Sequence, residues 1–180
     1  MDRPLTEVRI AAGLPTQHRP FSLAQFIGEV RLSAALEAQV KGCRLTVSAA
    51  DPDLAVDADR DLLLAAVGNL LQNAFKFTRH GTEVTLNAYA VADRILIDVE
   101  DHCGGLPPGH TERMFQAFMQ VGKDVTGLGL GLTISRLSVE ANAGILSVRD
   151  VTGSGCVFTI DMPRHSLPTG MPAAAEPMVS

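Results

Sequence analysis

Three side chains in the stretch NLLQNAFKF are spaced as a ligand-binding group would be: Asn69, Asn73 and Lys76. If the stretch is helical, they lie within about 60° of one another, opposite an apolar face. An amide oxygen is a hard ligand suited to Mg²⁺, and a lysine ammonium is a point charge for phosphate. The spacing therefore indicates a metal and polyphosphate site, although a solvated helix face would give the same pattern.

A carboxylate followed by glycines, in VEDHCGGLPPG, is a second candidate site. Asp101 comes at the C-terminal end of an apolar strand, and Gly104 and Gly105 follow it. Glycine lets the backbone approach a flat ligand closely, and a carboxylate accepts a hydrogen bond from an exocyclic amine such as adenine N6. A plain turn that contains one aspartate is the alternative interpretation.

Alternating glycines in TGLGLGLTISR, at Gly127, Gly129 and Gly131, precede an amphipathic pattern. A tight backbone here, with a helix starting at Leu130, would present free N–H groups and a positive dipole end to an anion. The stretch is not a GxxxxGK[ST] loop, and it departs from GxGxxG at Leu132. It predicts phosphate binding by another scheme, or else a flexible hinge.

Hydrophobic periodicity predicts the elements that would position these groups. One helix would be capped by Ser22 and ended by Gly42, and its apolar positions are Leu23, Phe26, Ile27, Val30, Ala34 and Leu36. A second helix covers 59–78, with an apolar face of Leu63, Val67, Leu70, Leu71, Ala74 and Phe75. Further helical stretches are predicted at 111–118 and from 130 to about 142.

Short stretches of alternating apolar and polar residues predict the strands. They cover 44–49, the second half of 51–59, 83–91, 94–101, 145–150 and 156–163, with turns at 80–81, 92–93 and 151–155. The alternation leaves one sheet face wet, so the amphipathic helices should pack on the other. The predicted fold class is a two-layer α/β sandwich with a mixed, mostly antiparallel sheet.

Composition narrows the function classes. The net charge is −5 and no basic run occurs, which argues against nucleic acid as a partner. No apolar run is long enough for a membrane span or resembles a secretory signal, so we expect a cytoplasmic domain without membrane contact. Cys43, Cys103 and Cys156 are widely spaced and odd in number, so we expect reduced thiols and neither a disulfide framework nor a zinc site.

The order of these stretches resembles the catalytic ATP-binding domain of bacterial sensor histidine kinases, within the GHKL superfamily of ATPases and kinases. NLLQNAFKFT is similar to its N box, DHCGGLP to its G1 box, MFQAF to its F box and GLGLGL to its G2 box. The resemblance covers roughly residues 20–164 and implies the Bergerat α/β sandwich, with ATP and Mg²⁺ as cofactors.

The resemblance also implies roles for individual residues. Asn73 would ligate Mg²⁺, Asn69 would lie beside the phosphates, and Lys76 would contact one of them. Asp101 would accept a hydrogen bond from the adenine amine, and Gly105 would let the ring lie against the loop. The remaining assignments are a lid anchored by Phe115 and Phe118, and phosphate contacts from Gly127, Leu128, Gly129, Leu130 and Gly131.

Two departures from the family pattern concern the site itself. Cys103 stands where the G1 box usually has glycine, so either Gly104 and Gly105 preserve the close approach or Cys103 is a reactive thiol at the pocket mouth. Asn69 stands where hydrolysing members place the glutamate that activates water. The expected reaction is therefore phosphoryl transfer to a partner side chain rather than ATP hydrolysis.

A third departure concerns the acceptor. No histidine lies in the family's His-Glu/Asp-Leu-Arg context; the five are His18, His80, His102, His110 and His165. We expect residues 1–20 to be a lead-in from a missing dimerisation domain, 21–164 the catalytic domain, and 165–180 a disordered tail. The expected partners are a histidine-bearing dimerisation domain and a downstream response regulator. A regulatory nucleotide-binding module without transfer, or an anti-sigma-type protein-serine kinase, are the alternatives.

Overall fold

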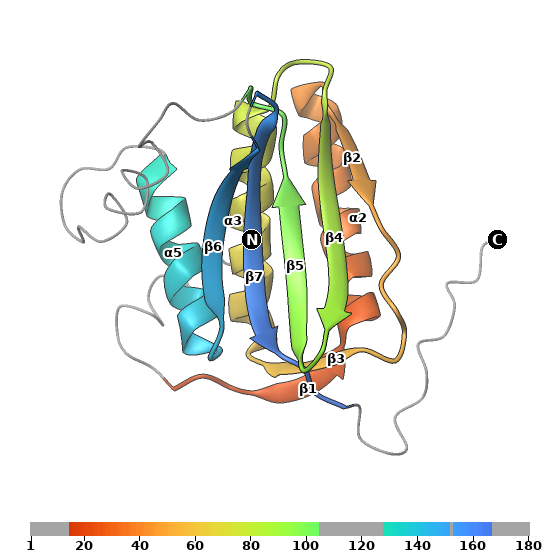
Figure 1. The fold of residues 1–180 in the computed structure, drawn as a ribbon, viewed down its shortest axis with the longest axis vertical. Coiled ribbons are helices and arrows are strands. Elements are labelled where there is room, and N and C mark those ends of the chain that lie inside the picture. Colours follow the sequence, from red (N-terminus) through yellow and green to blue (C-terminus); the bar gives the residue numbers. More distant parts are fainter. Residues whose placement is uncertain (1–14, 105–127, 152, 167–180) are drawn as a thin grey trace.

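The computed structural model describes residues 15–104, 128–151 and 153–166 of the chain (Figure 1). The helices are α2 (Leu23–Lys41), α3 (Arg60–Phe77) and α5 (Leu128–Ala141). The strands are β1 (Arg19–Ser22), β2 (Arg44–Val47), β3 (Ala55–Ala58), β4 (Glu83–Val91), β5 (Arg94–Glu100), β6 (Ile145–Val151) and β7 (Gly155–Pro163). Among the described residues, no helix combines the length and the apolar character that a membrane crossing requires.

The strands form a five-stranded sheet in the order β2-β4-β5-β7-β6. β2 is parallel to β4, and the other neighbours are antiparallel. A separate antiparallel pair, β1 with β3, lies at one end of the molecule, and α2 and α3 cover one face of the large sheet (Figure 1). The predicted two-layer α/β sandwich with a mixed sheet is confirmed.

Alternation along β5 shows how the strands divide their side chains between the two faces. Ile95, Ile97 and Val99 are at most 1% exposed and belong to the core. Asp98 points to the other face and is buried there; it accepts hydrogen bonds from the Tyr89 hydroxyl (2.7 Å) and the Thr159 hydroxyl (2.6 Å), which offset the cost of its burial. The uncovered face is thus held by cross-strand polar pairs.

Helix ends follow the local signals in the sequence. The Ser22 hydroxyl accepts from the backbone N–H of Gln25, and Gly42 ends α2 with a φ of 72°. The apolar face predicted for the second helix is buried in α3, whose N-cap Asp59 accepts from the N–H of Leu62. Leu36 was grouped with the apolar positions of α2, and this was wrong: it is 68% exposed, because it points away from the sheet and α3.

The predicted hairpins are confirmed as well. β4 and β5 are joined by a turn in which Ala92 takes a φ of 53°, and Gly81 turns the chain before β4 with a φ of 76°. β6 and β7 pair across the turn at Gly153, whose φ is also 76°. β5 and β7, one strand of each hairpin, pair with each other and join the two hairpins into one sheet.

Two boundaries differ from the prediction. α5 begins at Leu128 rather than Leu130, so Gly129 and Gly131 lie inside the helix, because packing against α3 overrides the weak helix propensity of glycine. His165 was predicted as the first residue of the disordered tail, but its N–H donates to the Ala55 carbonyl oxygen at 3.0 Å. The predicted helical stretch at 111–118 and residues 167–180 lie outside the described residues.

Candidate nucleotide-binding site

Asn69 does not lie on a solvated helix face, which was the alternative interpretation of its spacing. It is buried at 5% exposure, and its Nδ2 donates to the Gly131 carbonyl oxygen at 3.3 Å. The Ser135 hydroxyl reaches the same carbonyl oxygen at 2.9 Å and also the Ala66 carbonyl oxygen at 3.2 Å. Asn69 and Ser135 therefore tie the start of α5 to the middle of α3.

This tie fixes the direction of the α5 N-terminus. The first four N–H groups of a helix have no partner within the helix, so they attract an anion. In α5 these groups belong to Leu128, Gly129, Leu130 and Gly131. The resemblance implies phosphate contacts from these residues, and the structure shows the backbone of Gly131 bonded to α3.

Asn73 lies one turn after Asn69 on α3 and is half-buried. Its Nδ2 is buried, and among the described residues no group forms a hydrogen bond with it. A buried polar group left without a partner costs about 1–3 kcal/mol. The amide carries a donor and an acceptor on one rotatable bond, so its rotation would present either the nitrogen or the oxygen to a ligand.

Lys76, the third member of the predicted group, is exposed at the end of α3. Its ammonium lies 5.4 Å from the centre of the Phe77 ring. Lys76 follows Asn73 by three residues on the same helix, and its long side chain is flexible. Its ammonium can therefore reach an anion held near Asn73.

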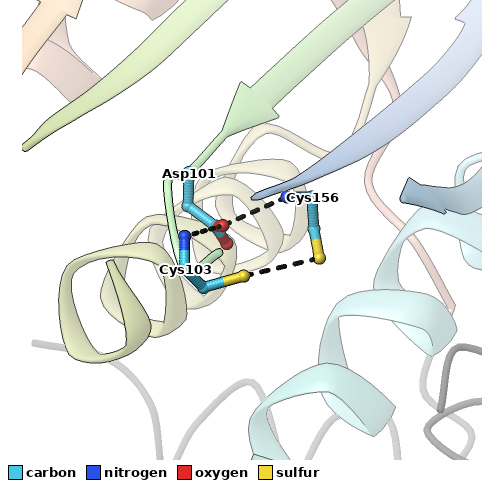
Figure 2. Close-up of side chains that lie close together, drawn as sticks. All are labelled: Asp101, Cys103 and Cys156. Carbon is cyan, nitrogen blue, oxygen red and sulfur yellow. Dashed lines mark hydrogen bonds between the residues drawn. The ribbon is translucent and has the colours of Figure 1, made fainter. Parts of the chain in front are cut away.

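Asp101 follows β5 directly and is 6% exposed. Its Oδ1 accepts hydrogen bonds from the backbone N–H groups of Cys103 and Cys156, both at 3.2 Å (Figure 2). Its own N–H donates to the Cys156 carbonyl oxygen at 3.0 Å. Among the described residues these bonds use one carboxylate oxygen, which leaves Oδ2 for a donor such as an exocyclic amine.

Two glycines shape the surroundings of Asp101. Gly104 takes a φ of 94°, and a Cβ there would overlap the guanidinium of Arg79. Gly155 starts β7, and a Cβ there would overlap the carbonyl oxygen of Asp101. The sequence analysis placed Gly155 in a turn. The structure shows that glycine is needed there because the Asp101 backbone lies directly against it.

The end of α3 holds the loop that carries Asp101. The His102 N–H donates to the Thr78 hydroxyl at 3.1 Å, and the Arg79 N–H donates to the His102 carbonyl oxygen at 3.1 Å. The His102 ring Nδ1 lies 2.5 Å from the Glu83 carbonyl oxygen. The helix with Asn73 and the loop with Asp101 are therefore one connected unit.

Cys103 and Cys156, which the sequence treated as unrelated thiols, are in contact beside this carboxylate. Their sulfurs are 3.8 Å apart, and both belong to backbone that bonds to Asp101 (Figure 2). Burial, and after it the nearby Asp101 carboxylate, raise the pKa of the Cys156 thiol well above its usual range. The positions are 53 residues apart in sequence, so no local spacing could have indicated the pair.

Not all of the predicted site residues are among those that the structure describes. Gly105, Phe115, Phe118 and Gly127 lie outside the described residues. For Leu128, Gly129 and Leu130 the structure gives the helical backbone alone. The structure brings two of the predicted residues, Asn69 and Gly131, into contact. It also links Asp101 to the end of α3, through the hydrogen bonds of His102 in the loop that follows Asp101.

A sequence profile of the family described as histidine kinase-, DNA gyrase B- and HSP90-like ATPases matches residues 58–166, more than half of the chain. The chain belongs to this ATPase family. The matched range contains Asn69, Asn73, Asp101 and Gly131.

Curated relatives of the chain include sensor and regulatory proteins. The sensory/regulatory protein RpfC of Xanthomonas campestris pv. campestris is 37% identical over 166 residues, which cover 85% of this chain and 22% of that protein. The aerobic respiration control sensor protein ArcB of Escherichia coli K12 is 31% identical over 149 residues, covering 79% and 19%. The chain spans about a fifth of the length of these relatives.

Solved structures agree on the fold. Full-length ShkA in complex with AMPPNP matches with a TM-score of 0.76 and 26% identity, covering 94% of this chain and 36% of that one. The catalytic domain of the histidine kinase ThkA matches with a TM-score of 0.69 and 21% identity, covering 82% and 96%. The second match therefore extends over almost the whole of an isolated catalytic domain.

Proposed function

We propose that this chain is the ATP-binding catalytic domain of a two-component sensor histidine kinase. It transfers the γ-phosphoryl group of ATP to a histidine on a dimerisation domain, which is supplied by the rest of its protein or by a dimer mate. A response regulator then receives the group. The sensor proteins among its relatives and the AMPPNP bound to ShkA support this assignment.

The observation that carries the proposal is the buried amide nitrogen of Asn73, which has no hydrogen-bond partner among the described residues. Asn73 lies on α3, one turn after Asn69, and Asn69 forms a hydrogen bond to the first turn of α5. An amide oxygen suits Mg²⁺, so the residue present fits the ion, and bound Mg²⁺ would neutralise phosphate charge. Asn73 holds the ion, Lys76 adds a positive charge, and the N–H groups of Leu128, Gly129, Leu130 and Gly131 face the phosphates.

Asp101 selects the base. Its Oδ1 is held by two backbone N–H groups, so the carboxylate keeps one orientation and offers Oδ2 to the adenine amine. Guanine carries a carbonyl oxygen at the same ring position. That oxygen and the carboxylate oxygen are both hydrogen-bond acceptors, so they would repel each other. The remaining family roles, the loop contact of Gly105, the lid anchors Phe115 and Phe118, and the phosphate contact of Gly127, rest on the resemblance.

The chain catalyses the transfer by position and charge rather than by acid–base chemistry. Asn69 carries an amide, which is not a general base, and its Nδ2 donates to the Gly131 carbonyl oxygen. The acceptor histidine nitrogen attacks the γ-phosphorus, the bond to the β-phosphate oxygen breaks, and ADP leaves. Hydrolysis is disfavoured because no carboxylate on this part of α3 activates water.

The test is calorimetric binding of a non-hydrolysable ATP analogue, with and without Mg²⁺. We expect saturable binding that requires Mg²⁺, with a free energy on the order of −4 to −8 kcal/mol. Asn73→Ala should weaken it at least tenfold. Asn87→Ala is the matched control, because Asn87 lies on β4 and bonds to Ser48.

Phosphotransfer is then tested with a supplied histidine-bearing dimerisation domain and radiolabelled ATP. An acid-labile label on that domain is the expected result. Binding without transfer would favour the regulatory module, and label on a serine of an antagonist protein would favour the anti-sigma-type kinase. No binding up to millimolar analogue would refute the proposal.

A further inference from the structure

The two sulfurs and the carboxylate beside the proposed adenine position form a compact donor set. One ligand atom each from Asp101, Cys103 and Cys156 lies within 4.8 Å of the other two. Figure 2 shows the three side chains converging from the end of β5, the loop after it and the start of β7. We propose that these three residues form a binding site for a thiophilic divalent cation, namely Zn²⁺.

The sulfur–sulfur distance suits a shared ion. In a tetrahedral site with Zn–S bonds of about 2.3 Å, two sulfurs are about 3.8 Å apart. The sulfurs of Cys103 and Cys156 are 3.8 Å apart as they stand. A disulfide, with a bond of about 2.05 Å, would require the two sulfurs to approach by nearly half that distance, so the arrangement fits a metal better than a covalent bond.

The donor types also suit zinc. Two thiolates with one carboxylate oxygen are ligands that Zn²⁺ accepts in proteins, whereas Mg²⁺ and Ca²⁺ prefer oxygen alone. On binding, each thiol releases its proton to solvent, and the two thiolates with the carboxylate form three bonds to the ion. The fourth position is left for water.

The backbone already holds the three ligands in place. The N–H groups of Cys103 and Cys156 both bond to Asp101 Oδ1, the Asp101 N–H bonds to the Cys156 carbonyl oxygen, and the Gly104 N–H bonds to the Ser154 carbonyl oxygen at 2.9 Å. Such bonds orient a ligating carboxylate and reduce the reorganisation needed on binding. No zinc site was expected from the sequence, because the cysteines are far apart along the chain. The pairing of β5 with β7 brings Cys103 and Cys156 together in space.

Occupation of this site would regulate nucleotide binding. This consequence rests on the proposed function, in which Asp101 Oδ2 accepts the adenine amine. A cation on the same carboxylate would compete for that oxygen, so Zn²⁺ and ATP should exclude each other.

Metal binding is tested on the full chain, with its thiols kept reduced by a phosphine. Titration with Co²⁺, a spectroscopic substitute for Zn²⁺, should give a thiolate-to-cobalt charge-transfer band that saturates at one equivalent and disappears when Zn²⁺ is added. Cys103→Ser and Cys156→Ser should lose the band and bind Zn²⁺ at least tenfold more weakly in competition with a chromophoric chelator. Cys43→Ser is the matched control and should keep both, because Cys43 lies at the end of α2.

The result that overturns the site is an absent band in the wild type, or an unchanged band in Cys103→Ser. Circular dichroism establishes that each variant is folded. If the buried Cys156→Ser does not fold, the half-exposed Cys103→Ser decides.

The second arm measures the ATP analogue with and without Zn²⁺. We expect Zn²⁺ to weaken binding at least tenfold in the wild type and to have no such effect in Cys103→Ser. Simultaneous binding of both ligands would overturn the exclusion. A cobalt band together with no binding of the ATP analogue, measured with Mg²⁺ present and without Zn²⁺ or Co²⁺, would refute the proposed function and keep the site. Mg²⁺-dependent binding of the analogue without a cobalt band would refute the metal site alone.

Discussion

Asn69→Ala and Asn73→Ala are the same substitution made one turn apart on α3. We expect them to change the free energy of unfolding in opposite directions. The amide of Asn69 is bonded to the Gly131 carbonyl oxygen at 3.3 Å, whereas the Nδ2 of Asn73 is buried with no partner among the described residues. Truncation to alanine removes a contact in the first case and an unmet polar group in the second. The pair therefore tests whether Asn73 is reserved for a ligand.

The magnitudes follow from these contacts. Asn69→Ala loses one hydrogen bond worth about 1 kcal/mol and leaves a cavity between α3 and α5, so a net loss of about 1–2 kcal/mol is expected. The carbonyl oxygen of Gly131 keeps its bond from Ser135, so no acceptor is stranded. Asn73→Ala relieves a cost of about 1–3 kcal/mol and gains up to about 0.7 kcal/mol in helix propensity, less the packing of the lost side chain.

We therefore expect Asn73→Ala to raise the free energy of unfolding by about 1 kcal/mol. For a chain of this size that corresponds to a rise in Tm of about 2–4 °C, while Asn69→Ala lowers Tm by a similar or larger amount. Denaturation of the nucleotide-free protein, followed by circular dichroism in urea and on heating, measures both. The analogue should bind at least tenfold more weakly to Asn73→Ala, which separates its ligand role from its role in folding.

A destabilisation of Asn73→Ala by more than about 1 kcal/mol would refute this reasoning, because it would show that the amide is satisfied in the free protein. Preserved Mg²⁺-dependent binding in the same variant would refute its role toward the ion. Gln72→Ala, at a half-buried neighbouring position on α3, controls for the general effect of truncation on this helix.

Three further predictions concern the region around Asp101. Asp101→Asn should weaken the ATP analogue about tenfold or more and change GTP binding little, as measured by calorimetry, because only the adenine amine needs the carboxylate; equal losses would count against this role. Gly155→Ala should destabilise the fold by about 1–3 kcal/mol, since its Cβ would overlap the Asp101 carbonyl oxygen, while Gly28→Ala on α2, with open space around it, should not destabilise it. Because burial raises the pKa of Cys156 above the ordinary value of 9.0, the unfolded chain releases this proton first, and stability should fall as pH rises above about 9. Cys156→Ser should flatten that fall in urea titrations at pH 8 and 10, and an unchanged slope would exclude Cys156 as its source.

Local signals in the sequence were sufficient for most elements. The Ser22 cap, the Gly42 terminus and the turn at Ala92 depend on residues within a few positions of each other, so their hydrogen bonds could be anticipated. The alternation in 94–101 likewise predicted a strand with one covered face, and in β5 that face carries the core residues Ile95 and Ile97. The same signals identified Asn73, Lys76 and Asp101 as candidates, since their chemistry is a property of residue type.

Contacts between distant segments could not be read in the same way. Asn69 shares the helix stripe of Asn73, yet it is buried because α5 packs across that part of α3. Leu36 fits the apolar spacing of α2 and is nevertheless exposed, because no element covers that side of the helix among the described residues.

The surroundings of Asp101 depend most strongly on tertiary structure. The chain by itself determined that a carboxylate ends an apolar strand and that glycines follow it. Only the pairing of β5 with β7 decided that Gly155 and Cys156 would lie against that carboxylate and that Cys156 would meet Cys103. Residue type and local spacing fix helices, turns and the chemistry available. Which of those groups meet is set by the burial of apolar faces across the sheet, a cooperative property of the whole fold that no single stretch of sequence carries.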